Sequence, residues 1–204
     1  MEGKGKERAR SSGLNRTFCI NLKQLIVLLL LVMIVVATVF WVVLRIDMHK
    51  RWASMLRESQ RLRDHLDEVA YLLPAKFQMN PDGINQNWLL AELHYADNSL
   101  LELIELDKEH QVPLLKIDDM IITLRDPETN LSRLNNIEQR DLIEAIRNIG
   151  WKVANAYWNL INYTSVDSVN GPPFWYFGPS PPDEALLQEA VELAAEVKTK
   201  ISSQ

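Results

Sequence analysis

The sequence has few of the residues on which disulfide frameworks and common catalytic motifs depend. It contains one cysteine, Cys19, and only seven glycines in 204 residues. A single cysteine allows no intrachain disulfide. The motifs G-x-S-x-G, G-x-x-x-x-G-K-S/T and H-E-x-x-H do not occur. We therefore predict no cofactor and do not expect an enzyme, although missing motifs alone do not exclude one.

What the sequence does contain is one long apolar run, residues 25–44 (LIVLLLLVMIVVATVFWVVL), whose only polar side chain is Thr38. Twenty helical residues extend for about 30 Å, the thickness of the hydrocarbon core of a bilayer. A cleaved signal peptide is the alternative, because basic residues precede the run and Val35 and Ala37 resemble a cleavage site. The apolar part of a signal peptide is usually only about 7–15 residues long. The run is therefore predicted to be an uncleaved transmembrane helix.

The orientation of this helix is not decided by the charges closest to it. Three basic residues lie in the fifteen positions before the run and four in the fifteen after it. The N-terminal tail is short and basic, however, and long downstream domains are translocated with little regard to charge. We predict a single-pass protein of the cell membrane, with its N-terminus in the cytoplasm and the bulk of the chain extracytoplasmic.

The charge of the chain changes sign along its length. Residues 1–24 and residues 45–63 each hold six basic and two acidic side chains, whereas residues 64–204 hold ten basic and twenty-three acidic ones. Basic segments on both sides of a span favour anionic membrane lipid, by about 1 kcal/mol per Lys or Arg. The acidic remainder repels polyanions, so nucleic acid is not expected as a partner.

Apolar side chains continue after the run at alternating spacings of four and three. This seam consists of Met48, Trp52, Met55, Leu62, Leu66, Val69 and Leu73, and Ser59 is its only polar position. The pattern predicts that the span continues as a stalk helix that Pro74 stops. The seam has two interpretations, which the sequence leaves open. It pairs with a second copy as a parallel coiled coil, or it packs against later helices of the same chain.

Four further helices are predicted from apolar positions at helical spacing, over residues 87–109, 114–124, 135–163 and 180–201. In the first of them the predicted inward positions are Leu89, Leu93, Ala96, Leu100 and Leu103, and that face is predicted to be broadened by Trp88, Leu90 and Ile104. Asn135 and Glu138 have the spacing of a capping box, and Ser180 is the predicted N-cap of the last helix. No segment alternates like a strand. The expected fold is all-α, with one N-terminal transmembrane helix that continues into a stalk helix, followed by an antiparallel bundle of four or five helices.

These elements divide the chain into four predicted segments. They are a basic cytoplasmic tail (1–24), the transmembrane helix (25–44), the stalk helix (45–73) and an acidic α-helical domain (74–204).

The longest irregular connection, residues 165–182, contains the predicted binding site. Four consecutive aromatic residues, Phe174, Trp175, Tyr176 and Phe177, lie there between two pairs of prolines. One interpretation is a rigid lid whose rings fill the space between two helices. The other is a recognition surface for a peptide, a glycan or a partner protein, because rigid aromatic side chains lose little entropy on binding.

Three histidines have a carboxylate three residues away: His65 with Glu68, His94 with Asp97, and His110 with Asp107. Di-metal bundles also need inward glutamates from several helices. The apolar seam of residues 135–163 offers none, so no metal site is predicted and these histidines are expected to be solvated or to cap helices.

The function that these features favour is a membrane-anchored extracytoplasmic helical binding or scaffold protein. Its partner would be another protein, a second copy held through the stalk, or a small ligand. One alternative is a single-span sensory or ligand-binding module. The other is a membrane-bound enzyme without a recognisable motif, which would need several inward carboxylates or histidines around a pocket.

Overall fold

The computed structural model describes residues 22–74, 83–126, 131, 134–160 and 181–202. In these residues every regular element is helical, which confirms the predicted all-α fold. The elements are α1 (Leu22–Leu72), α3 (Gly83–Leu106), α4 (Gln111–Arg125), α5 (Asn136–Ala156), the short 3-10 helix η2 (Trp158–Leu160) and α7 (Glu184–Ser202). The predicted division into four segments remains a prediction. The chain forms two units, residues 1–45 and residues 46–204.

In the first unit, the described residues form the N-terminal part of α1, and its apolar side chains are uncovered. Between residues 25 and 44 the exposed fraction of the large apolar side chains runs from 39% at Trp41 to 68% at Met33. The Thr38 hydroxyl donates a hydrogen bond to the Ile34 carbonyl at 2.8 Å, so the only polar side chain is satisfied within the helix. By length and composition, α1 is the one helix among the described residues that can cross a membrane.

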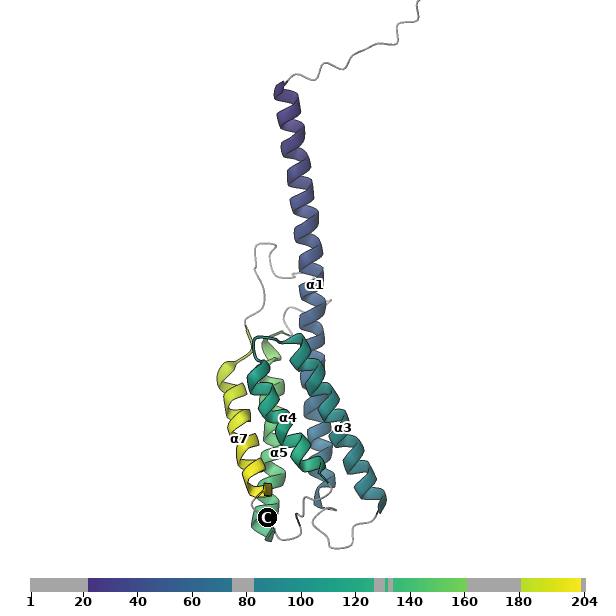
Figure 1. Ribbon diagram of the computed structural model, residues 1–204, viewed down its shortest axis with the longest axis vertical. Helices are drawn as coiled ribbons and strands as arrows, with labels where there is room; N and C mark the ends of the chain where they lie inside the picture. Colours follow the sequence, from purple (N-terminus) through teal and green to yellow (C-terminus); the bar gives the residue numbers. More distant parts are fainter. Residues whose placement is uncertain (1–21, 75–82, 127–130, 132–133, 161–180, 203–204) are drawn as a thin grey trace, which may run out of the picture. The chain divides into compact units, whose positions relative to one another are not determined.

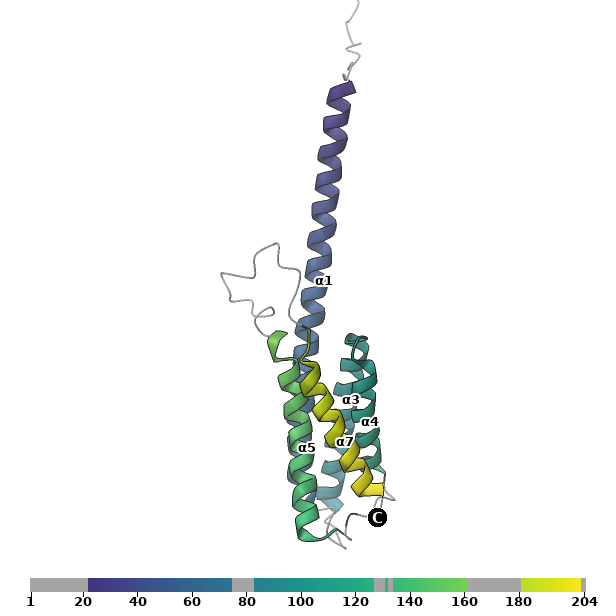
Figure 2. The same ribbon diagram turned by 90° about the vertical axis from the view of Figure 1, so that its left-hand side faces the viewer.

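In the second unit, five helices surround one core (Figures 1 and 2). Helix α4 packs between α3 and α7, and α7 packs against α5. Residues 46–72 of α1 complete the ring, because His65 reaches Glu92 of α3 and Asp67 pairs with Arg147 of α5. Helices that follow one another in the chain run in opposite directions, whereas α4 and α7 run the same way (Figure 1).

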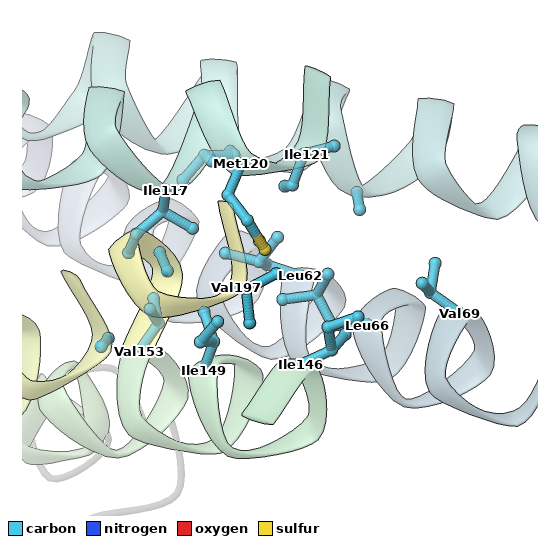
Figure 3. Packing of buried hydrophobic residues seen from close by; sticks show 14 of the residues in the cluster. Leu62, Leu66, Val69, Ile117, Met120, Ile121, Ile146, Ile149, Val153 and Val197 are labelled. Atoms are coloured by element: carbon cyan, nitrogen blue, oxygen red, sulfur yellow. The ribbon is translucent and has the colours of Figure 1, made fainter. Parts of the chain in front are cut away.

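The core is built from side chains of all five helices. Figure 3 shows α1, α4, α5 and α7 directing apolar side chains toward one another. Those that are completely buried include Leu62, Leu66, Val69, Ile117, Met120, Ile121, Ile146, Ile149 and Val153. Burying each such side chain contributes roughly 1.5–3 kcal/mol. Most of the predicted inward positions are therefore confirmed, including Leu89, Leu93, Ala96, Leu100 and Leu103 of α3.

One detail of the helix predictions is confirmed and another is corrected. The capping box is present, because the Asn135 side chain accepts from the backbone of Glu138 and the Glu138 side chain accepts from the backbone of Asn135. The predicted start of the last helix was wrong. Helix α7 begins at Glu184, and the Asp183 side chain accepts from the N–H groups of Ala185 and Leu186 at 3.0 and 3.2 Å. Asp183, an acceptor at the preferred N-cap position, therefore caps the helix, and Pro181 precedes it.

Helices α1 and α5 approach each other closely at Gly150. A Cβ atom built on Gly150 would lie 3.1 Å from the Arg63 Cα and 3.3 Å from the Leu66 Cβ. The Arg63 guanidinium lies over the ring of Trp151, 4.9 Å from its centroid, beside this contact. The missing side chain thus lets the two backbones meet, which allows α1 to close the ring.

We expect Gly150→Ala to destabilise the bundle by about 1–2 kcal/mol, because the new methyl group must displace backbone. Helix propensity acts in the opposite direction, since Ala is favoured over Gly by about 1 kcal/mol in a helix interior. Asn155→Ala, at an exposed site on the same helix, is the control for propensity alone. Thermal unfolding followed by circular dichroism measures both variants, and a Gly150→Ala protein as stable as the control would contradict the close approach.

Candidate functional site

The aromatic residues of the predicted binding site, Phe174, Trp175, Tyr176 and Phe177, lie outside the described residues. Both interpretations of that segment, the lid and the recognition surface, therefore remain predictions. The described chain resumes at Pro181, next to the start of α7.

The structure places most of the predicted self-association seam inside the chain's own core. Met55 is 7% exposed, and Leu62, Leu66, Val69 and Leu73 are completely buried. Packing against later helices, one of the two alternatives for the seam, accounts for these five side chains. Met48 is exposed and Trp52 is partly buried against the core. Self-association through the stalk remains a prediction, and it would have to use the part of the seam that contains Met48 and Trp52.

A buried polar cluster lies at the end of the bundle where α3 and α5 end and α4 and α7 begin. The Asp107 carboxylate accepts a hydrogen bond from the Tyr157 hydroxyl at 2.6 Å and pairs with His110 Nδ1 at 2.8 Å. The backbone N–H of His110 also donates to this carboxylate, at 3.3 Å. The residues Asp107, Tyr157 and His110 are 3%, 0% and 8% exposed. A buried carboxylate requires such partners, because an unpaired one would be strongly destabilising.

Local sequence explains how three segments meet at this cluster. Helix α3 ends at Leu106, whose carbonyl accepts from Arg51 Nε of α1 at 2.6 Å, and the turn 107–110 leads into α4. Pro113 falls in the first turn of α4, where its missing N–H has no consequence. The start of α7 is tied to the end of α5, since the Asp183 N–H donates to the Ala156 carbonyl at 3.0 Å.

The cluster changes the acidity of its tyrosine. Burial, followed by the hydrogen bond to Asp107 and the negative charge of that residue, raises the pKa of Tyr157 above its ordinary value. Tyr157 is therefore a neutral donor. The Asp107 carboxylate is the acceptor for the Tyr157 hydroxyl and the His110 backbone, so the hydrogen of the His110 ring is assigned to Nδ1. A ring that carries its one hydrogen on Nδ1 has Nε2 as an acceptor, and no described group bonds to Nε2.

A cleft of about 610 Å³ opens beside this cluster. Its walls include Glu109, His110, Pro113, Glu184, Leu187 and Gln188, from the α3–α4 turn and the first two turns of α4 and α7. His110 thus connects the buried cluster with the cleft. Chemically, the cleft combines one oriented imidazole, that of His110, with the surface carboxylates of Glu109 and Glu184.

A second hollow, of about 530 Å³, lies between α1 and α3. Its lining includes Arg57, Glu58 and Arg61 from α1 and Glu102 and Glu105 from α3. Glu58 is buried and pairs with Arg61 at 3.0 Å and Arg57 at 3.8 Å. Charges of both signs alternate here, so this hollow favours no single class of ligand.

The other histidines do not join the cluster. His65 Nδ1 bonds to Glu92 at 2.8 Å instead of to its sequence neighbour Glu68, and His94 lies near Asn98 on the exposed face of α3. The expectation of a solvated or capping histidine was wrong for His110, which is buried and whose side chain caps no helix. Among the described residues no three His, Cys, Asp or Glu side chains converge as metal ligands.

A pair of carboxyl groups lies between α3 and α4. Asp118 is 8% exposed and shares a hydrogen bond with Asp97, which also pairs with Arg125 at 2.5 Å. Burial, followed by the hydrogen bond and charge of Asp97 and the charge of Asp119, raises the pKa of Asp118 from 3.8 to about 6; the charge of Arg125 opposes the shift. One oxygen of Asp118 has no partner in the described chain.

Two of these residues had weak signals in the sequence. Tyr157 lies off the apolar seam of its helix and fifty residues from Asp107, so their contact depends on tertiary structure. Asp118 lies between the inward positions Ile117 and Ile121 of α4, and its place on the inner face is visible in that spacing.

No protein-family model, curated protein or solved structure matches this chain. The site must therefore be interpreted from its own geometry.

We expect Tyr157→Phe to destabilise the bundle by about 1–2 kcal/mol, because the Asp107 carboxylate loses a hydrogen-bond donor. The site is buried, so water cannot take the place of the lost hydroxyl. Tyr95→Phe removes a hydroxyl from an exposed ring and is the matched control. Chemical unfolding of both variants measures the difference. Equal stability of the two variants would contradict the buried hydrogen bond.

We expect Asp118→Asn to stabilise the protein above pH 6 and to leave its stability almost unchanged below about pH 4, the ordinary pKa of the carboxyl group. The pKa of Asp118 is higher in the folded than in the unfolded chain, so its contribution falls as pH rises from about 4 through 6. At pH 8 the gain is expected to be about 1–2 kcal/mol. Melting temperatures at about pH 3.5 and at pH 8, with exposed Asp141→Asn as the control, measure it. A gain of the same size at both pH values would contradict the raised pKa.

Proposed function

We propose that this chain is a single-pass membrane protein whose helical bundle acts outside the cytoplasm by binding a partner or ligand. The observation that supports the anchor is the contrast in burial within α1. The apolar side chains of residues 25–44 are uncovered, whereas the apolar side chains from Met55 to Leu73 on one face of the helix are buried. Nineteen uncovered apolar residues, with one threonine bonded within the helix, are stable in lipid and unfavourable in water.

The orientation rests on charge. The tail before the span is basic, and the bundle is acidic, which suits a cytoplasmic tail and a translocated domain. Basic residues that follow the span, such as Lys50 and Arg51, suit contact with anionic head groups. The membrane would hold the bundle at high local concentration next to other membrane proteins, which favours weak binding.

The proposed mode of action is recognition, with the cleft beside His110 as the candidate site. The cleft is open to solvent and combines apolar walls, such as Pro113 and Leu187, with a small number of polar groups. This combination is typical of ligand sites.

One observation favours an enzyme as the second candidate. A histidine that is oriented by a buried aspartate and exposes Nε2 to a cleft has the geometry of a general base. Among the described residues, however, no hydroxyl or thiol bonds to that nitrogen. Recovery of an unchanged ligand after prolonged incubation would favour the binding function, and its conversion would favour the enzyme.

The single native cysteine provides a direct test of the anchor and its orientation. In intact cells that express the full chain, a membrane-impermeant maleimide is expected to leave Cys19 unlabelled until the cells are permeabilised. In a Cys19→Ser background, Glu144→Cys, on the exposed face of α5, is expected to be labelled without permeabilisation. The full chain is also expected to stay in the membrane pellet after carbonate washing.

The outcomes separate the two parts of the proposal. Labelling of Cys19 in intact cells, together with protection of Glu144→Cys, would reverse the orientation. Release by carbonate, or a mature chain that begins after residue 44, would contradict the anchor.

A further inference from the structure

The cleft beside His110 has a consistent hydrogen-bonding character. His110 Nε2 is an acceptor, and the carboxylates of Glu109 and Glu184 are acceptors with negative charge. Among the described residues of its walls, Gln188 contributes the only side-chain amide donor, and that amide already donates to Glu192 at 3.1 Å. A ligand that matches these walls must donate several hydrogen bonds and carry positive charge.

His110 is the group that distinguishes this cleft from an ordinary acidic surface. Its side chain is 10% exposed and is held by the nearly inaccessible Asp107, so the ring is fixed in one orientation. Its Nε2 atom has no described partner, although the residue lines the cleft. A fixed and unpartnered acceptor is therefore available to a ligand, at no further cost in side-chain entropy.

We propose that this cleft binds a primary ammonium group, which donates to His110 Nε2 and is neutralised by Glu109 and Glu184. An ammonium group has three N–H donors and one positive charge, which matches the three acceptors. This proposal names the ligand class of the proposed binding function and rests on that function. It depends on the proposed membrane anchor only if a lipid is the source of the amine.

Two sources supply the same chemistry. This end of the bundle is the end that is covalently attached to the span, because Ile46 begins the second unit and Arg51 contacts the end of α3. An ethanolamine head group of a membrane lipid is therefore one source. A free alkylamine in solution is the other.

The test uses the full chain in dodecyl maltoside micelles at constant pH, with isotope-labelled histidine observed by NMR. The probe is 1,4-diaminobutane, and 1,4-butanediol is the uncharged control of the same length. We expect the His110 resonances to shift saturably with the diamine and not with the diol. The resonances of His94, on the exposed face of α3, are expected not to shift.

Variants identify the groups that bind. Glu109→Gln and Glu184→Gln are each expected to raise the Kd for the diamine about fivefold, the effect of removing one surface ion pair. Both residues are exposed, so the fold is expected to survive, and exposed Glu144→Gln on α5 is the matched control with unchanged Kd. His110→Gln is expected to abolish binding, but the two glutamate variants keep the test valid if that protein does not fold.

Nanodiscs then distinguish the sources. A lipid source predicts that the His110 resonances are already shifted in discs that contain phosphatidylethanolamine and not in discs of phosphatidylcholine. A free amine predicts identical spectra in the two discs until the diamine is added. The proposal is overturned if the diamine causes no saturable shift in micelles, if the diol acts equally, or if both glutamate variants bind as the unmodified chain does. The micelle experiment needs no bilayer, so failure of the membrane anchor would not affect it.

Discussion

The structure depends on the burial of one face of α1 beneath helices of the same chain. Leu62, Leu66 and Val69 lie at the centre of the core, between α4, α5 and α7 (Figure 3). Without this buried face of α1, a gap between α3 and α5 would leave the inner faces of the other four helices exposed. Gly150 makes the contact possible, since it allows the backbone of α5 to meet that of α1 at Arg63. Burial of this face also brings Arg51 to the end of α3, beside the turn that contains Asp107 and His110.

Helix α1 changes its sequence pattern along its length, and each pattern suits a different environment. Residues 25–44 are apolar on all sides, whereas the later part of the helix buries one face and exposes charged residues such as Arg57 and Asp64 on the other. An all-round apolar helix is favoured in lipid, and a one-sided helix is favoured against a protein core. One helix thus supplies both the proposed anchor and one face of the observed core. Basic residues between them suit the interface of water and lipid.

Much of this fold follows from the sequence because helical spacing directly determines which side chains share a face. The inward positions of α3, α4 and α5 and the capping box at Asn135 were predicted for this reason. Trp88 and Leu90 were predicted to widen the inner face of α3, but they are exposed, because the neighbouring helices cover a narrower strip. The site was less predictable. The spacing of Asp107 and His110 is visible in the sequence, but burial of the pair and its contact with Tyr157 require three distant segments to meet.

The central claim, that residues 62–70 of α1 belong to the same cooperative core as α5, is tested most directly by native-state hydrogen exchange of the full chain in nanodiscs. The account predicts that amides at 62–70 and at 146–153 open with the same free energy, and that Leu66→Ala lowers both by the same amount. If residues 62–70 instead opened separately, and Leu66→Ala left the protection of α5 unchanged, α1 would be a free stalk and the account would be contradicted.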